Sequence, residues 1–156
     1  MRFNRMTFFI LFILCVAGIV FGLYILIKKP NSGLPMARIS IGGKTFNAEL
    51  AQTMLQQMRG LSGRDGLPED GGMLFLFSNS GSYGIWMKDM KFPIDIVWVR
   101  GDKVVGSAEN AEPEPGKPLW SLKIYYPPEE IDRVLEMNAG TVQKYGLKVW
   151  DSVVVE

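Results

Sequence analysis

The chain has 156 residues and a formal net charge of +1, and it contains one cysteine and no histidine. Without histidine, and with Cys15 as its single thiol, the chain lacks the groups for a Ser-His-Asp or Cys-His catalytic centre, a disulfide or a typical zinc site. Enzymatic chemistry would have to use carboxylates, lysine, tyrosine or an oxygen-ligated metal, and no cofactor is predicted.

Residues Thr7 to Ile27 form an apolar run of 21 positions without a charged residue, and 15 of these positions are Phe, Ile, Leu or Val. A helix of about 20 apolar residues crosses a bilayer. The run is longer than the apolar part of a signal peptide and no small-residue cleavage site follows it, which favours an uncleaved anchor. Residues 1–29 are therefore predicted to be a transmembrane anchor. Its short basic flanks are Arg2 and Arg5 on one side and Lys28 and Lys29 on the other.

The orientation and association of this anchor are weakly specified. Two basic residues flank each end, so the positive-inside rule gives little bias. We expect the N-terminus inside the cell and the following domain outside the cytoplasm. Gly18 and Gly22 form a G-x-x-x-G pair, which can bring two spanning helices together as a homodimer. Glycine is frequent in such helices, so a chance pair is the simpler explanation.

The segment 30–35 contains two prolines and a glycine and is predicted to be a linker. Residues 36–156 have the length of a single domain. Four of the 17 Lys and Arg residues flank the apolar run, so the rest of the chain carries 13 against all 16 acidic residues, a net charge of −3. This balance argues against nucleic acid and against an anionic lipid surface as the main partner of the domain.

Short alternating runs separated by turn residues predict a series of strands. They cover residues 37–41, 44–48, 73–77, 83–87, 94–99, 120–126 and 152–155, with a further strand that begins at 103 after a tight turn. Short helices are predicted at 51–58 and 141–145, and the segment 128–137 fits either a helix or a strand. Many short strands and few helical stretches indicate a β-sandwich or a barrel.

Several blocks of residues resemble one known family in their order and spacing. The blocks are Arg59-Gly60-Leu61 with Arg64, Gly72-Met73-Leu74-Phe75 with Phe77, Trp86-Met87-Lys88 with residues 92–95, and Val134-Leu135-Glu136 with Ala139-Gly140. In these blocks the chain resembles the domain of unknown function 192 family, a group of conserved membrane or secreted proteins. The resemblance implies a jelly-roll-like β-sandwich and no known activity. Two positions depart from the family: Asp89-Met90 replaces Asn-Thr, and Trp150-Asp151 replaces Gly-Asp.

The densest group of polar and aromatic residues lies between positions 86 and 95. A carboxylate at Asp95 would lie among apolar neighbours and would need a partner, for which an arginine is suited. A ligand pocket and a structural ion pair bracing residues 60–72 explain this pattern equally well. The candidate ligand-binding residues are Trp86, Lys88 and Asp89, and the candidate supporting residues are Arg59, Arg64 and Asp95.

The sequence thus favours a membrane-tethered module that binds a small-molecule or cell-envelope ligand at the membrane surface. The alternative is a carboxylate-dependent hydrolase acting on a glycan or an ester, with Asp89 and Asp95 as a glycosidase-type pair. Calcium could use Glu109, Glu112 and Glu114 as oxygen ligands. A solvated loop explains these three residues more simply, so no metal site is predicted.

Overall fold

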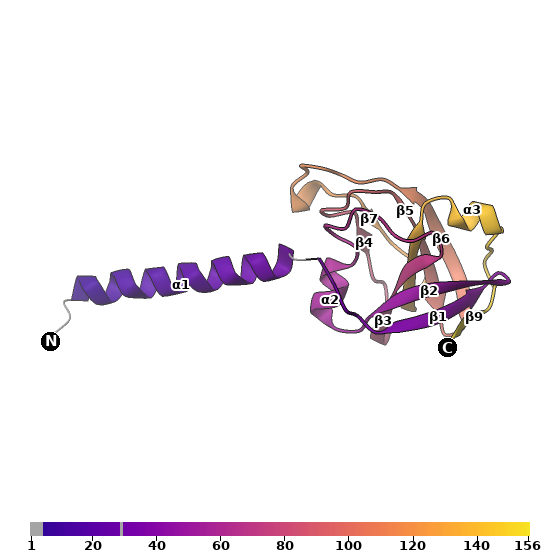
Figure 1. The fold of residues 1–156 in the computed structure, drawn as a ribbon, viewed down its shortest axis with the longest axis horizontal. Helices are drawn as coiled ribbons and strands as arrows, with labels where there is room; N and C mark the ends of the chain where they lie inside the picture. Colours follow the sequence, from indigo (N-terminus) through magenta and orange to yellow (C-terminus); the bar gives the residue numbers. More distant parts are fainter. Residues whose placement is uncertain (1–4, 29) are drawn as a thin grey trace.

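A computed structural model of the chain describes residues 5–28 and 30–156. Its first element is the helix α1 (Arg5–Lys28), which extends away from the β-rich domain (Figure 1). Within the described residues, no helix is both long enough and apolar enough to cross a membrane. The anchor predicted at Thr7 to Ile27 therefore stays a prediction. Arg2 and Lys29, two of its predicted basic flanks, lie outside the described residues.

The domain is built around one sheet of seven strands in the order β6-β5-β8-β3-β2-β1-β9. Its strands are β1 (Met36–Ile41), β2 (Lys44–Ala51), β3 (Gly71–Gly81), β5 (Ile94–Arg100), β6 (Lys103–Ala111), β8 (Ile131–Asn138) and β9 (Val153–Val155). A separate ribbon pairs β4 (Ile85–Trp86) with β7 (Ile124–Tyr125). The short helices are α2 (Met54–Arg59), α3 (Thr141–Tyr145) and the single 3₁₀ turn η1 (Leu119–Ser121).

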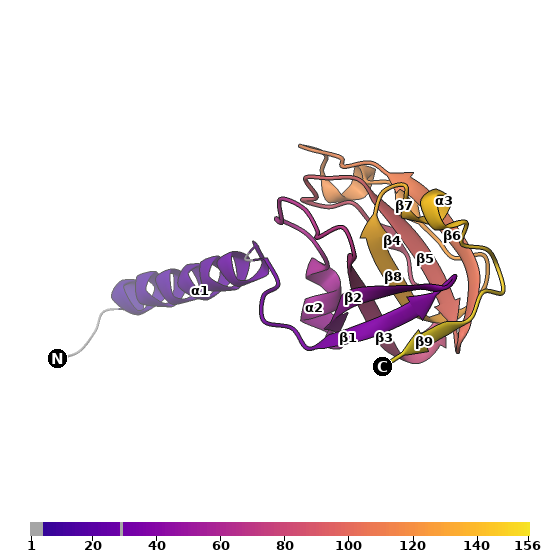
Figure 2. The same cartoon turned by 45° about the vertical axis from the view of Figure 1, so that its right-hand side comes forward.

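The sheet curls until its two outer strands meet (Figure 2). Lys103 at the start of β6 forms an isolated bridge with Ser152, just before β9. Next to this bridge, the N–H of Val104 donates to the carbonyl of Asp151 (3.0 Å) and the N–H of Val153 donates to the carbonyl of Asp102 (2.8 Å). These bonds cover the unpaired edges that an open sheet would expose.

This closure corrects the predicted two-sheet, jelly-roll-like sandwich. The chain is mainly β with few short helices, as predicted, but its main strands form a single curled sheet. The pairing of β2 with β3 is parallel, from Asn47 opposite Gly71 to Ala51 opposite Phe75, whereas every other pair in the sheet is antiparallel. The connection through α2 and its following loop makes this parallel crossover possible, because parallel neighbours cannot be joined by a tight turn.

The neighbouring strands β5, β8 and β3 of the curled sheet are largely buried on both faces. On β3, Leu74 faces one apolar cluster inside the curl, whereas Met73 and Phe75 face a second cluster outside it. Side chains alternate between faces along a strand, so β5 and β8 contribute to both clusters in the same way. Burial on both faces explains why the ambiguous segment 128–137 forms the strand β8, since a strand placed between β5 and β3 has no polar face.

Other predicted elements are shorter in the structure. The strand expected at 83–87 covers only Ile85–Trp86. The helix expected at 51–58 begins only at Met54, because Ala51 ends β2 and Thr53 caps the helix. The strand expected at 120–126 is divided: Trp120 lies in η1, and within this segment only residues 124–125 pair, with β4. The turn η1 occupies the start of this segment, and Pro127 and Pro128, which cannot donate to a ladder, prevent the strand from continuing beyond it.

The predicted linker is in part packed against the domain. Asn31 is buried, and its side-chain amide donates to the carbonyls of Gln56 (2.9 Å) and Gly60 (3.0 Å) at the end of α2. The carbonyl of Asn31 accepts a hydrogen bond from Arg64 (3.0 Å). The chain between α1 and β1 is therefore held against α2 rather than serving as a free spacer.

Candidate functional site

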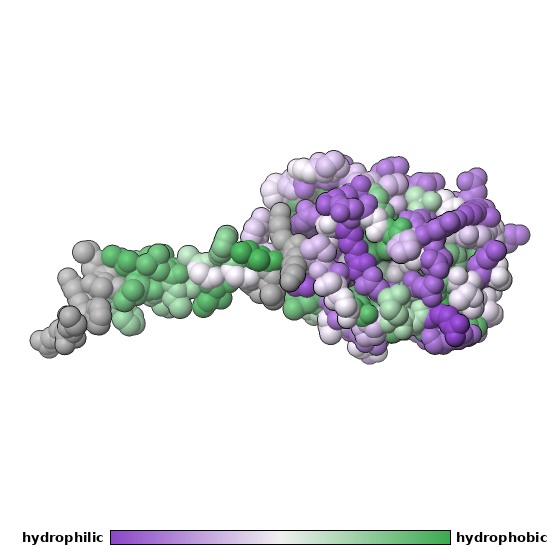
Figure 3. Space-filling view, in the orientation of Figure 1, coloured by the Kyte–Doolittle hydropathy of each residue, from purple (hydrophilic) through white to green (hydrophobic). Residues whose placement is uncertain are grey.

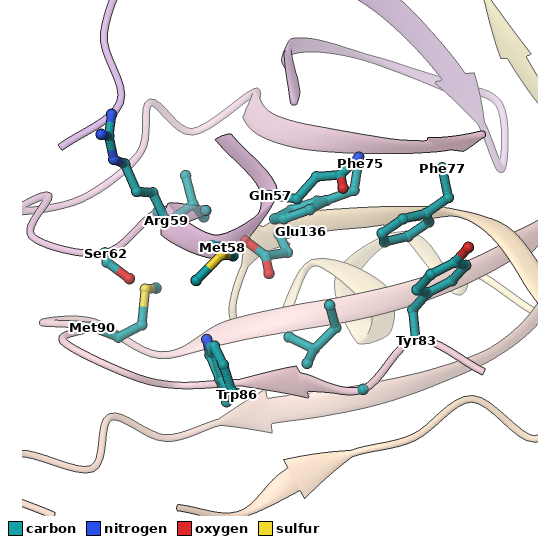
Figure 4. A pocket seen from close by; sticks show the side chains of 14 residues that line it. Gln57, Met58, Arg59, Ser62, Phe75, Phe77, Tyr83, Trp86, Met90 and Glu136 are labelled. Carbon is teal, nitrogen blue, oxygen red and sulfur yellow. The ribbon is translucent and has the colours of Figure 1, made fainter. Parts of the chain in front are cut away.

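A cavity of about 220 Å³ lies on the outer face of the sheet, between α2 and the short strand β4 (Figure 4). Its lining is mostly apolar. The end of α2 and the next residues (57–62) form one side, β3 contributes Phe75 and Phe77, residues 83–86 form the opposite side, and Met90 and Glu136 complete the lining. The exposed members are Met58, Gly84 and Trp86, which place the mouth of the cavity between α2 and β4.

Local sequence signals place α2 over this cavity. The hydroxyl of Thr53 accepts a hydrogen bond from the N–H of Gln56, whose side chain accepts one from the N–H of Thr53 (2.9 Å), so both sides of a capping box are formed. The helix ends at Gly60, which has a φ of 47°. A Cβ atom there would lie 3.1 Å from the ring of Phe75 and 3.7 Å from Oε2 of Glu136. Glycine thus lets the end of α2 approach the floor of the cavity.

Glu136 on β8 is the buried ionisable group of this cavity. Its side chain points to the outer face of the sheet with Val134, whereas Leu135 and Met137 point into the curl. The residue is 4% exposed. Among the described residues, no hydrogen bond or salt bridge engages its carboxyl group. Burial raises the pKa of Glu136 from 4.5 to about 8, against a smaller opposing effect of the positive charge of Arg64. The group is therefore mostly protonated near pH 7.

The neighbouring arginines are directed elsewhere. Arg64 forms a two-armed ion pair with Glu49, in which Nη1 contacts Oε1 and Nη2 lies 2.8 Å from Oε2. This arrangement matches the planar fork of a guanidinium to a carboxylate. Arg59 lines the cavity with part of its side chain, but Figure 4 shows its guanidinium turned away from the other lining side chains. Among the described residues, Glu136 is thus the one carboxyl group in the lining of the cavity.

Aromatic rings form much of the cavity wall. The rings of Phe77 and Tyr83 stack with their centroids 3.7 Å apart and an angle of 6° between their planes. The hydroxyl of Tyr83 donates to the carbonyl of Asn79 (2.8 Å), which fixes the orientation of its ring. Trp86 is 37% exposed and stands at the mouth. The site therefore combines an apolar, aromatic lining with one buried carboxyl group, a composition typical of small-ligand pockets.

Comparison with protein families identifies the domain. The sequence model of the domain of unknown function 192 family, described as "Uncharacterized ACR", matches residues 37–155. The chain belongs to this family. The prediction made from the residue blocks is thereby confirmed. No match is found among curated protein sequences.

Two solved structures are similar to this chain in fold and sequence. A protein from Sinorhizobium meliloti 1021, described as a candidate transcription regulator, is 28% identical with a TM-score of 0.72, and the match covers 80% of this chain and 97% of that one. A protein of unknown function from Novosphingobium aromaticivorans is 30% identical with a TM-score of 0.72, and the match covers 81% of this chain and 89% of that one.

The structure divides the predicted ligand-binding residues. Trp86 lines the cavity, whereas Lys88 and Asp89 lie outside it on the turn after β4 and pair with each other at the surface. Asp89 has a φ of 54°, a left-handed conformation that asparagine and aspartate tolerate best. Met90, which follows Asp89 and forms with it the first departure from the expected family pattern, lines the cavity.

The predicted pairing of Asp95 with an arginine is wrong. Asp95 is fully buried, but it shares the inner face of β5 with Val97 and Val99 rather than the cavity face. Its carboxylate accepts hydrogen bonds from the N–H groups of Asn110 (2.9 Å) and Val142 (2.8 Å). Asp95 thus ties the start of α3 to the sheet. It does not face a common space with Asp89, so the carboxylate pair of the hydrolase hypothesis is not assembled.

The backbone of the turn after β4 helps to brace the loop after α2. The hydroxyl of Ser62 donates to the carbonyl of Lys88 (2.7 Å), and the N–H of Gly63 donates to the carbonyl of Asp89 (2.9 Å). The loop 60–72 is therefore braced by main-chain groups of this turn and by the ion pair of Arg64 with Glu49, and not by a side-chain pair at Asp95.

Sequence reasoning missed Glu136 as a site residue. Two signals could have found it. It is an acidic residue within the otherwise apolar run from Val134 to Met137, where a charge is costly. It also belongs to a residue block that the chain shares with the domain of unknown function 192 family. Because the segment 128–137 fitted a helix and a strand equally well, its sequence did not show the face to which Glu136 points.

Proposed function

We propose that the protein is a membrane-tethered binding module whose ligand site is the cavity above Glu136. The observation that carries this proposal is a carboxyl group, 4% exposed and without a hydrogen-bond partner among the described residues, that faces an apolar cavity. A buried polar group that makes no hydrogen bond lowers stability. Such a group is retained more readily where a ligand completes its hydrogen bonding, and perturbed carboxyl groups in clefts mark functional sites.

Membrane tethering is supported by the run without charges from Thr7 to Ile27. Every described side chain of α1 is exposed, including Phe8, Phe12 and Phe21, and Figure 3 shows apolar surface concentrated along this helix. A helix that is apolar all round is stable when an apolar medium covers it. The contacts of Asn31 with α2 would then keep the cavity close to the membrane surface.

A ligand screen with two matched tryptophan variants tests the proposed site. The full chain in maltoside micelles would be screened for small molecules that raise its melting temperature. Trp86→Ala, which removes a lining side chain at the mouth, is expected to abolish the shift. Trp120→Ala is the control, because Trp120 is 89% exposed and does not line the cavity. Equal loss in both variants, or no ligand-induced shift from a broad panel, would contradict the proposal.

A further inference from the structure

We propose that the cavity above Glu136 binds the ammonium group of an organic cation, with Glu136 as its counter-charge and the aromatic rings as its walls. This inference rests on the proposed binding function and adds the chemical class of the ligand. It follows from three features of the cavity: the sign of the charge that its lining can offer, the aromatic character of its walls, and the lack of a hydrogen-bond partner for its carboxyl group among the described residues.

The charged groups around the cavity disfavour an anionic ligand. Arg64 is already engaged in its two-armed pair with Glu49. The guanidinium of Arg59 is turned away from the interior of the cavity in Figure 4. An anion would therefore meet the acid Glu136 without a facing cation, whereas a cation would meet its opposite charge.

The cavity wall is suited to a cation whose water has been removed. Four aromatic rings line the cavity: Phe75, Phe77, Tyr83 and Trp86. The face of an aromatic ring attracts ammonium groups, and the attraction increases when the site is desolvated. Rings that surround a quaternary or alkylated ammonium group form the aromatic cages known from other proteins. The methionine side chains of Met58 and Met90 complete the wall with polarisable, adaptable contacts.

The empty and the occupied cavity differ by one proton. The titratable and charged groups near the carboxyl are Arg59 at the end of α2, Arg64 in the next loop and Tyr83 before β4. Burial holds the pKa of Glu136 at about 8, so the empty site is neutral near pH 7. A bound cation stabilises the carboxylate, and the displaced proton passes to the solvent. Below the pKa, the affinity for the cation then rises about tenfold for each pH unit.

Choline and its uncharged carbon analogue provide the decisive comparison. In the analogue a tert-butyl group replaces the trimethylammonium group, so that shape is kept and charge is removed. Both would be titrated by calorimetry into the full chain in maltoside micelles near pH 7, in two buffers with different ionisation enthalpies. We expect choline to bind at least about tenfold more tightly than its analogue. Choline binding should release close to one proton, and its affinity should rise between about pH 6 and about pH 7.

Two variants that each convert a carboxyl to an amide separate the site from general charge effects. Glu136→Gln keeps the shape of the side chain but cannot ionise, and it should lose both the preference for choline and the release of the proton. Asp89→Asn is the matched control, because Asp89 lies outside the cavity and its left-handed backbone conformation accepts asparagine. This control should bind choline as the original chain does.

The possible results distinguish this inference from the proposed function. Equal binding of choline and the analogue, without proton release, would overturn the cationic ligand and leave the binding cavity standing. Absence of choline binding would overturn the inference whatever else binds.

A second experiment uses nanodiscs with and without phosphatidylcholine. Choline binding that is lost only in the phosphatidylcholine discs would identify the ligand as a lipid headgroup, whereas binding in both would identify a free cation.

Discussion

Replacement of Glu136 by glutamine should make the domain more stable in neutral and mildly alkaline solution. The pKa of Glu136 is raised from 4.5 to about 8 by burial in the folded chain. Between these two values the folded state holds a proton that the unfolded state has released. The contribution of this group to the free energy of unfolding is therefore largest below pH 4.5, and it is lost as the pH rises through about 8.

The magnitude follows from this shift. Each pH unit within the window lowers the free energy of unfolding by about 1.4 kcal/mol while one proton separates the two states. Between about pH 6 and about pH 8 the loss is about 2 kcal/mol, because the group begins to ionise in the folded state as its pKa is approached. The chain has no histidine, so no imidazole titrates in this range and obscures the effect.

Urea unfolding of a chain of residues 30–156, followed by tryptophan fluorescence, would measure this change. The original sequence should lose about 2 kcal/mol between about pH 6 and about pH 8, whereas Glu136→Gln should lose little. The comparison between the two chains removes contributions from groups that titrate in both. Parallel pH dependence in the two chains would show that Glu136 is ionised in the folded state at neutral pH, and would refute the argument from burial.

Three further predictions test other parts of the structure. Asn31→Ala should lower the free energy of unfolding by about 1–3 kcal/mol in urea titrations, because the buried carbonyl of Gly60 loses the amide of Asn31 and the carbonyl of Gln56 keeps only the N–H of Gly60. Ser32→Ala, an exposed control, should change the free energy of unfolding by less than about 0.5 kcal/mol. Equal effects of the two changes would mean that the segment does not pack on α2. Asp95→Ala should lower the free energy of unfolding by more than about 2 kcal/mol, because it leaves two backbone amides unpaired. Lys88→Ala should leave the free energy of unfolding nearly unchanged in the same assay. Similar losses in the two variants would contradict this reasoning. The full chain should stay with membranes after an alkaline carbonate wash, and its release by the wash would exclude the anchor. Gly18→Ile should weaken any dimer of the anchored form.

Local signals in the sequence were sufficient for most strands and turns. The Gly42-Gly43 turn between two alternating runs produced β1 and β2 as predicted, and the turn at Gly101-Asp102 joined β5 to β6. The residue blocks were sufficient to recognise the domain of unknown function 192 family. These features depend on contacts between residues close in the chain, or on patterns of residue type, which a sequence displays directly.

The site was predicted only in part because it depends on which face of each strand is covered. Of the residues grouped from the sequence, Trp86 and Arg59 line the cavity, and Arg64 lies close enough to act on the pKa of Glu136. Asp95 was assigned to the same group, although its position on β5 turns it to the inner face of the sheet. Pairing of residues far apart in the chain, such as β3 with β8, decides that question. A shift by one residue in such a register exchanges the two faces of a strand.

The sequence by itself therefore determined the mainly β composition, the family, the charge-free run near the N-terminus and the absence of histidine and domain cysteine. Only the tertiary structure decided that the strands curl into one sheet, that Asp95 holds backbone amides, and that Glu136 lies in an apolar cavity beneath α2. The physical reason is that the ionisation of a carboxyl group depends on its solvation and its neighbours. Those neighbours are brought to Glu136 by the parallel crossover from β2 to β3, which carries α2 over the outer face of the sheet.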